Sequence, residues 1–193
     1  MSAPELARCS WVNLKNPRYV QYHDQEWSVP CHDDHALYEL LILECFQAGL
    51  SWECVLNKRE AFRRAYEGFD AARVAAYGEE KAAALLADPG IIRNRLKVRA
   101  SIRNSQVFLD IQAEFGSFDR YIWSFTDVRV IREDWTLRTA SPLSDAVSAD
   151  LKKRGMTFVG STMIYSYLQA IGVLAAHSPE CFCCRRETGE RTE

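Results

Sequence analysis

Residues 176–184, AHSPECFCC, concentrate side chains that can bind a metal ion. His177 and Cys181 are four positions apart, so one helical turn or a tight loop can direct both at a single ion. Cys183 and Cys184 follow directly. Three interpretations are open at this point: a metal site, a disulfide, or a thiol-rich end without a role. A tetrahedral zinc site requires two further ligands from elsewhere in the chain.

The N-terminal part of the chain offers two ligands of the same kinds, Cys9 and His23. Added to His177 and Cys181 they would complete a Cys₂His₂ set, and this requires the two ends of the chain to be close in space. Seven cysteines, an odd number, argue against a disulfide framework, as does an N-terminus without the apolar segment of a signal peptide. Spacing alone does not select this set over the other candidates, which are Cys31, His32, Cys183 and Cys184.

Glu44 stands out because it occupies an apolar position of a predicted helix. A helix that begins at Asp33 or Asp34 and runs to about Ala48 places it on the same face as Leu37 and Leu41. Burying a carboxylate costs several kcal/mol unless it is well hydrogen-bonded. The acid therefore either reaches solvent or a loop amide at the edge of this face, or lines a functional pocket.

Aromatic side chains are frequent in the first quarter of the chain. They are Trp11, Tyr19, Tyr22, Trp27 and Trp52. A nucleobase that has been flipped out of a DNA duplex needs flat surfaces for stacking and polar edges for hydrogen bonds. A hydrophobic core also needs aromatic residues, and that is the commoner explanation for any one of them.

The stretch between Asp88 and Asp110 contains five arginines and lysines and no acid. Residues 81–102 predict a helix, a tight turn at the DPG sequence, and a second helix that begins just after Gly90 and carries the basic side chains. Free backbone N–H groups at a helix start bind phosphate, and cations add attraction to DNA. This helix-hairpin-helix pattern predicts DNA contacts, with a solvated basic helix as the alternative. The candidates are Gly90, Arg93, Arg95 and Lys97.

The remaining pattern is helical almost throughout, which predicts an all-α fold. Further helices are expected to begin at Ser51 and Asp70 and to run over about 81–87, 91–114, 144–155 and 162–176. Residues 127–142 are loop-like, with RVI as a short strand, and 185–193 are expected to be a disordered tail.

Length and composition are those of an ordinary globular protein. The 193 residues suit one domain or two small lobes, and 48% of them are hydrophobic and 26% charged. The apolar runs are too short to span a bilayer, so we expect a cytoplasmic protein without membrane contact. A net charge of −2 does not by itself indicate a nucleic-acid partner.

Several segments occur in an order that resembles the bacterial 3-methyladenine DNA glycosylase I family. They are RCSWV, YVQYHDQEWSVP, LILECFQAGLSWECVLNKREAF, DPGIIRNRLKVRASIRNS, YIWSF, LKKRGMTFVGSTMIYSYLQAIG and HSPEC, and they cover roughly residues 8–184. QAGLSW and KRGMTFVGST are the most specific. The resemblance implies an all-helical helix-hairpin-helix DNA glycosylase fold with one glycosylase domain, or two helical lobes, over residues 1–184.

The resemblance also implies a zinc ion that joins the two ends of the chain. By position, its ligands fall on Cys9, His23, His177 and Cys181. Four protein ligands leave no open position for water, so this Zn²⁺ would be structural rather than catalytic. The saturated set disfavours a third class of function, a zinc hydrolase.

The base pocket of the family falls on Glu44, Tyr22, Trp52, Trp27 and Trp11. The resemblance implies that Glu44 is catalytic and accepts hydrogen bonds from the modified adenine with help from Tyr22, while Trp52 stacks on the base. N3 methylation gives the base a positive charge and makes it a good leaving group. A carboxylate nearby favours this cation and an oxocarbenium-like transition state.

The implied activity is DNA repair by a monofunctional glycosylase, since no lysine nucleophile falls on a matching position. The enzyme would bind double-stranded alkylated DNA as a monomer, flip out 3-methyladenine and excise it by hydrolysis, at the nucleoid when bound to DNA. The alternative is a zinc-stapled DNA-binding module without catalysis. Ser28 and Cys45 stand at positions where the family often has glycine. These two differences bear on the shape of the pocket.

Overall fold

The computed structural model describes residues 6–132 and 138–184, so the expected tail at 185–193 lies outside the described residues. The described part is mostly helical, as the sequence predicts. Its helices are α1 (Pro17–Gln25), α2 (Asp34–Gln47), α3 (Trp52–Ala65), α4 (Ala71–Ala75), α5 (Glu79–Ala87), α6 (Arg95–Phe115), α7 (Phe118–Ser124), α8 (Pro142–Lys153) and α9 (Ser161–Ala170). Two short strands, β1 (Ile131–Arg132) and β2 (Leu174–Ala175), pair in parallel.

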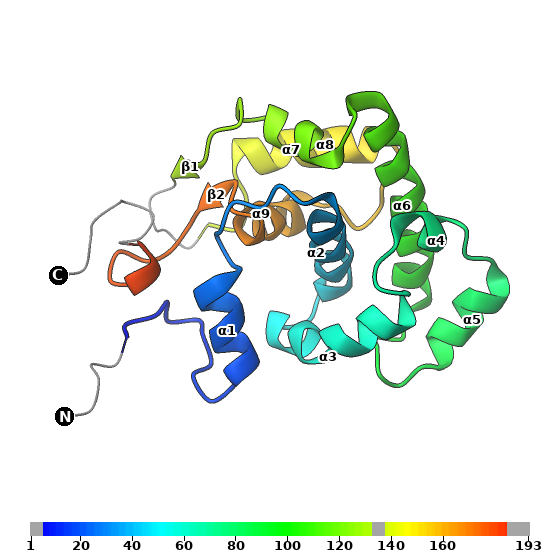
Figure 1. Ribbon diagram of the computed structural model, residues 1–193, viewed down its shortest axis with the longest axis horizontal. Coiled ribbons are helices and arrows are strands. Elements are labelled where there is room, and N and C mark those ends of the chain that lie inside the picture. The colour runs from blue at the N-terminus through cyan, green and yellow to red at the C-terminus, as the bar shows by residue number, and fades with distance from the viewer. Residues whose placement is uncertain (1–5, 133–137, 185–193) are drawn as a thin grey trace.

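Helix α2 forms the centre of the molecule. Figure 1 shows it between α9 and α6, and it also packs against α3 and α7. Leu37 and Leu41 are fully buried, and so are residues on the other faces of the helix such as Ile42 and Phe46. A helix surrounded on all sides is apolar all round rather than amphipathic. Glu39 and Glu44 of α2 therefore lie in the protein interior.

Helix starts follow the predicted side-chain caps in most places. Asp33 caps α2 and Ser51 caps α3, each through a side chain that accepts a backbone N–H from the first turn. The predicted start of α8 at Ser144 is three residues late, because Ser141 is the cap and forms a reciprocal capping box with Ser144. The predicted end of the last helix near Ala176 is also wrong, since α9 stops before Gly172, whose φ of 73° breaks the helix.

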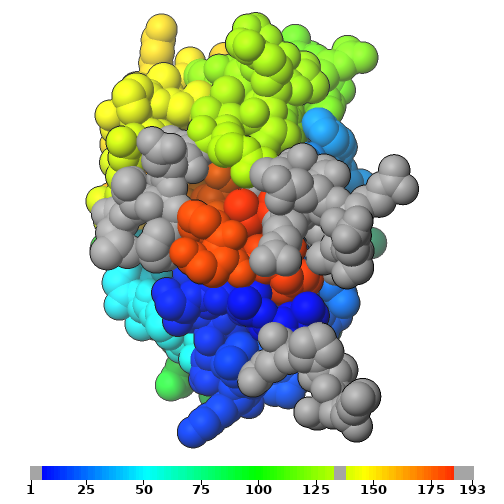
Figure 2. Space-filling model, turned by 90° about the vertical axis from the view of Figure 1, so that its left-hand side faces the viewer, coloured from blue at the N-terminus to red at the C-terminus, as the bar shows by residue number. Residues whose placement is uncertain are grey.

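The two ends of the described chain lie side by side. Both lie on the left in Figure 1, and Figure 2 shows the N-terminal segment in direct contact with the C-terminal one. The backbone N–H of Phe182 donates to the carbonyl of Ala7 at 2.9 Å. This meets the requirement for shared ligands from both ends. Within the described ranges, no helix has the length and apolar character needed to cross a membrane.

Candidate active site and metal-binding cluster

The four predicted metal ligands form one buried cluster. Their ligand atoms all lie within 4.8 Å of one another. Sγ of Cys9 is 3.5 Å from Nδ1 of His177, and Sγ of Cys181 is 3.5 Å from Nε2 of His23 and 3.6 Å from Nδ1 of His177. The fold therefore brings together two residues from each end of the chain.

These distances fit a tetrahedral zinc ion. With Zn–S of about 2.3 Å and Zn–N of about 2.0–2.1 Å, the sulfur–nitrogen edge of a tetrahedron is about 3.6 Å. Two thiols and two imidazoles are also the donors of many structural zinc sites. Nδ1 of His23 lies 2.8 Å from Oδ1 of Asp24, and Nη2 of Arg8 lies 2.7 Å from Oδ2 of the same carboxylate. A carboxylate of this kind orients a histidine ligand and makes its other nitrogen more basic.

The other candidate ligands lie at different places. His32 contacts Asp119 at 2.7 Å and stacks on Trp123. Cys183 lies beside His23 and Asp24, next to the cluster but outside the set of four. Sequence spacing could not make this distinction, because it depends on how the chain ends meet.

A cavity of about 190 Å³ lies next to this cluster, between α1, α2, α3 and α9. All five predicted pocket residues line it, together with four that the sequence analysis did not assign. The full lining is Trp11, Tyr19, Tyr22, Trp27, Glu44, Gln47, Trp52, Ser166 and Gln169. Gln47 is three residues after Glu44 and therefore lies on the same helix face. This spacing could have identified Gln47 as a pocket residue from the sequence.

Two of the residues that line this cavity carry buried polar atoms without a protein partner. Glu44 is 3% exposed, and its Oε2 has no hydrogen-bond partner. Nε1 of Trp52 is also buried without a partner. Burial raises the pKa of Glu44 to about 8. Buried polar atoms are nearly always hydrogen-bonded in proteins, so an acceptor and a donor left open on residues that line one cavity indicate a ligand that supplies the complementary groups.

The aromatic walls connect the cavity to the cluster. The rings of Tyr22 and Trp52 lie 5.2 Å apart at 46°. On the other side, the Trp27 ring packs edge-on against His177 at 4.7 Å, and Trp11 packs against His23 at 5.3 Å. Two walls of the cavity thus rest on metal-ligand candidates, so a metal ion there would also stabilise the cavity.

The two departures from the family leave the cavity intact. Ser28 has a φ of 64°, in the left-handed region that favours glycine, and its hydroxyl bonds the strand β2 through the carbonyl of Leu174. Cys45 is fully buried, and its sulfur accepts a hydrogen bond from Asn104. Neither side chain lines the cavity.

The predicted DNA-binding hairpin needs correction. Helix α6 begins at Arg95 rather than at 91, because the Asn94 side chain accepts the N–H groups of its first turn. The N–H of Gly90 donates to Oδ1 of Asp88 at 2.7 Å. Lys97 is 5% exposed, and its ammonium donates to carbonyl oxygens at the end of α2, so the expectation that it faces DNA is wrong. Arg93 and Arg95 are exposed.

A second hairpin, between α8 and α9, lies closer to the cavity. Helix α9 follows Gly160, which provides no side-chain cap, and its residues Ser166 and Gln169 line the cavity. A groove of about 440 Å³ along the start of α9 shares Gln47 and Ser166 with the cavity. Lys152 and Lys153 are exposed at the end of α8.

Known proteins resemble this chain over nearly its whole length. The methyladenine glycosylase family matches residues 11–184. The chain is 42% identical over 182 residues to DNA-3-methyladenine glycosylase 1 of Escherichia coli (strain K12), covering 92% of this chain and 97% of that protein. It is 37% identical over 180 residues to DNA-3-methyladenine glycosylase of Haemophilus influenzae, covering 91% and 97%.

Solved structures agree. A crystal structure of 3-methyladenine DNA glycosylase I superimposes with a TM-score of 0.88 at 44% identity, covering 92% of this chain and 99% of that one. A tyrosine-to-phenylalanine variant of such an enzyme, in complex with 3-methyladenine, superimposes with a TM-score of 0.87 at 32% identity, covering 91% and 96%.

Proposed function

The chain belongs to the methyladenine glycosylase family, and from this premise we propose that it excises 3-methyladenine from alkylated DNA by hydrolysis of the bond between base and sugar. The observation that best supports this function is an aromatic cavity lined by the buried carboxyl group of Glu44, whose Oε2 has no hydrogen-bond partner. Such a cavity suits a flat cation. A base can enter it only after leaving the duplex, so the enzyme flips the nucleotide.

Glu44 supplies the electrostatic part of the mechanism. Because burial raises its pKa to about 8, the empty cavity favours the neutral acid near neutral pH. A methylated, cationic base beside the carboxyl favours its ionised form, and the anion in turn stabilises the positive charge that spreads over base and sugar as the bond breaks. Neutral adenine offers no such charge, so the cavity discriminates against it.

The aromatic rings supply the stacking part. Trp52 lines the cavity and provides a face on which the base can stack. Stacking of one base on one ring contributes about 1–3 kcal/mol, and a cationic base adds attraction to the ring's electrons. Among the described residues that line the cavity there is no lysine, which supports direct hydrolysis without a covalent intermediate.

A structural zinc ion held by Cys9, His23, His177 and Cys181 forms the second part of the proposal. The tetrahedral spacing of their ligand atoms supports it. When bound, the ion contributes its binding energy to folding rather than to the reaction. Its four ligands join the chain ends and support the ring of Trp27 at the cavity.

Of the two hairpins, the one between α8 and α9 is the better candidate for DNA contact. The amides that begin α6 are already bonded to Asn94, whereas α9 has no side-chain cap and lies beside the cavity. Amides at a helix start attract phosphate. Exposed Lys152 and Lys153 add positive charge to this hairpin.

Incubation with methylated duplex DNA, followed by identification of the released base, tests this function. We expect release of 3-methyladenine by the wild type and much slower release by Glu44→Gln, which keeps the shape of the side chain and removes its charge. Single-turnover kinetics with a folding check separates chemistry from damage to the fold. A wild-type protein that binds the DNA and releases no base would support the alternative, a DNA-binding module without catalysis.

A further inference from the structure

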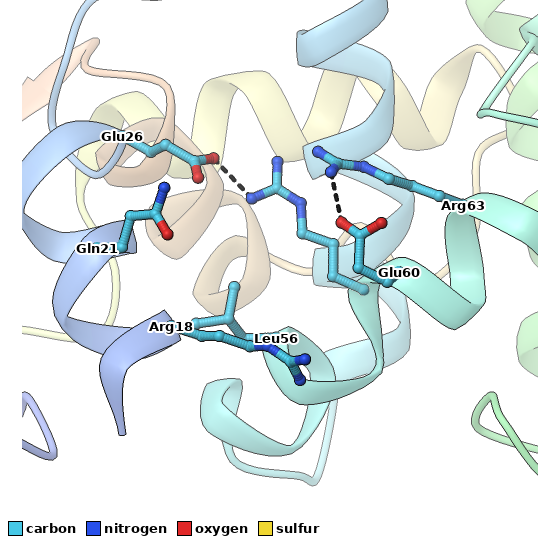
Figure 3. A pocket seen from close by; sticks show the side chains of 7 residues that line it. Arg18, Gln21, Glu26, Leu56, Glu60 and Arg63 are labelled. Atoms are coloured by element: carbon cyan, nitrogen blue, oxygen red, sulfur yellow. Dashed lines mark hydrogen bonds and ion pairs between the residues drawn. The ribbon is translucent and has the colours of Figure 1, made fainter. Parts of the chain in front are cut away.

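The guanidinium of Arg59 contacts two carboxylates at once in a second cavity, distinct from the base pocket, that Glu26 and Glu60 also line (Figure 3). Its Nε donates to Oε1 of Glu39 at 2.5 Å, and its Nη1 donates to Oε2 of Glu26 at 2.6 Å. The side chain of Arg59 is 11% exposed, that of Glu39 is 4% exposed and that of Glu26 is 39% exposed. One cation therefore joins a buried acid to a partly exposed one.

The three helices tied by this contact are the ones that build most of the base pocket. Arg59 is on α3, which begins with Trp52. Glu39 is on α2, which also carries Glu44. Glu26 caps the end of α1, and its backbone N–H donates at 2.9 Å to the carbonyl of Tyr22, whose ring packs against that of Trp52 on the wall of the base pocket.

Of the other side-chain hydrogen bonds between the start of α1 and α3, the one from Asn16 to Glu53 is partly buried and those to Asn57 are exposed. Nδ2 of Asn16 donates to Glu53 at 2.7 Å and to Asn57 at 3.0 Å. Arg18 donates to the carbonyl of Asn57 at 3.3 Å. Water competes with such exposed contacts, so each fixes the position of α1 weakly. The contact to Arg59, which is anchored on a buried acid, is better able to fix the distance between α1 and α3.

We infer that Arg59, acting through Glu26, is a positioning residue that sets the position of Tyr22 relative to Glu44, and thereby the width of the base pocket. Arg59 does not line that pocket. The inference rests on the proposed function, because it assigns the width of the pocket to recognition of 3-methyladenine. Small displacements of binding groups have large effects on recognition and rate.

Glu26→Gln is the main test, and free 3-methyladenine is the probe, so that DNA contacts play no part. We expect about tenfold weaker binding of the base by titration of tryptophan fluorescence. The thermal midpoint should stay near that of the wild type, because a partly exposed ion pair contributes little to stability. A purely structural role would move the midpoint and leave the affinity of the folded protein unchanged.

Glu60→Gln is the matched control. Glu60 lines the same cavity in Figure 3 and pairs with Arg63 at 2.6 Å, but both residues are on α3 and Arg63 otherwise bonds Glu39 on α2, so this pair makes no contact with α1. This variant should bind the base as the wild type does. Equal losses of base affinity in Glu26→Gln and Glu60→Gln would show that the effect comes from the change in surface charge alone, and would overturn the inference.

Arg59→Lys separates geometry from charge, because it keeps the cation and cannot hold both carboxylates in the same fork. We expect it to weaken base binding at least as much as Glu26→Gln, and the double variant to be no weaker than Arg59→Lys alone. Losses that multiply, or wild-type affinity in Glu26→Gln, would contradict the positioning role. Failure of the wild type to bind the base would instead contradict the proposed function.

Discussion

Helix α2 carries two buried glutamates in opposite surroundings. Glu39 has a side chain that is 4% exposed and accepts hydrogen bonds from Arg59 at 2.5 Å and Arg63 at 2.9 Å. Glu44, five residues later, is 3% exposed, and one of its carboxyl oxygens has no partner. Burial is nearly the same at the two positions, so the difference lies in what the rest of the protein provides to each acid.

This contrast separates polar groups that the protein satisfies itself from those that it leaves open for a ligand. A buried acid with its own cations holds helices together, whereas a buried acid without them costs stability and is retained for its effect on a substrate. The backbone shows the same division, because the amides at the start of α6 are bonded to Asn94 and those at the start of α9 have no side-chain cap. Each prediction below tests one side of this division.

Loss of the metal cluster should have the largest effect. Cys181→Ser removes one of four ligands, and a structural metal contributes its binding energy to folding. We expect one zinc ion per wild-type chain by metal analysis, loss of that zinc in the variant, and a collapse of thermal stability. Cys183→Ser, beside the cluster but outside the set of four, is the control and should keep the metal. A wild type that is free of metal and equally stable would rule out the zinc proposal.

Loss of Glu39, the acid with its own cationic partners, should lower the free energy of unfolding by less than loss of the metal, but still strongly. Glu39→Ala leaves the buried side of Arg59 without its partner, and breaking a buried pair costs about 3–5 kcal/mol in free energy of unfolding. Denaturation in urea measures this. Glu60→Ala removes an exposed partner of Arg63 and should cost at most about 1 kcal/mol. Equal stability of the two variants would show that Glu39 is no better anchored than a surface acid.

Removing the charge of the unpaired acid should stabilise the fold at high pH. The pKa of Glu44 is raised to about 8 by burial, from an ordinary value of 4.5, so the folded state holds this proton more tightly than the unfolded state. The contribution of Glu44 to stability is therefore full below about pH 4.5 and falls as the pH rises to about 8. Glu44→Gln does not titrate, and its free energy of unfolding should exceed that of the wild type by a few kcal/mol at pH 8, with little difference at pH 4.

The same comparison, made against the wild type at each pH, cancels the titration of all other groups. A difference in stability that does not change between pH 4 and pH 8 would mean that Glu44 finds a partner in solution. The combination of higher stability and slower excision would identify the open carboxyl as a functional group, because the fold is better without its charge and the reaction is worse.

The sequence identified the open groups better than the satisfied ones. Glu44 was singled out because it interrupts an apolar helix face, whereas the four residues of the metal cluster were selected by the family resemblance, since spacing alone left other ligands open. Glu39 was not singled out, since its partner Arg59 comes from another helix and no local spacing reveals that pairing. Lys97 was misassigned to DNA for the same reason: its acceptors are the carbonyls of Phe46 and Ala48, more than forty residues away.

Helix content and most helix starts were predictable, because caps and apolar periodicity are local properties. The error at α6 arose from a competing local signal. The DPG turn predicted a helix that begins immediately after Gly90, whereas the side chain of Asn94 offers a better cap four residues later. The DNA contact predicted for this hairpin stays a prediction, while the amides of Gly90 and Lys97 are bonded within it, to Asp88 and Asn94.

Trp52→Ala tests the stacking wall and should have a moderate effect. Loss of one base–aromatic stack should weaken binding of free 3-methyladenine by about 1–3 kcal/mol. Trp52 is half-buried at the start of α3, so the variant should fold, and isothermal titration calorimetry can compare it with the wild type. Unchanged affinity would mean that the base lies elsewhere in the cavity and that Trp52 only fills space.

The smallest expected effect distinguishes the two hairpins. DNA affinity falls with salt in proportion to the number of phosphates that cations neutralise, with a slope of about 0.9 per contact, so loss of one contact lowers the slope by about 1. We expect this loss for Lys153→Ala at the hairpin before α9. Arg95→Ala, equally exposed at the start of α6, should leave the slope unchanged, because the neighbouring amides are bonded to Asn94 and offer a phosphate nothing further. Fluorescence anisotropy with undamaged duplex DNA at several salt concentrations measures both variants. A lower slope for Arg95→Ala alone would return the DNA contact to the hairpin that the sequence first indicated, and would show that a capped helix start can still serve as the phosphate-binding one.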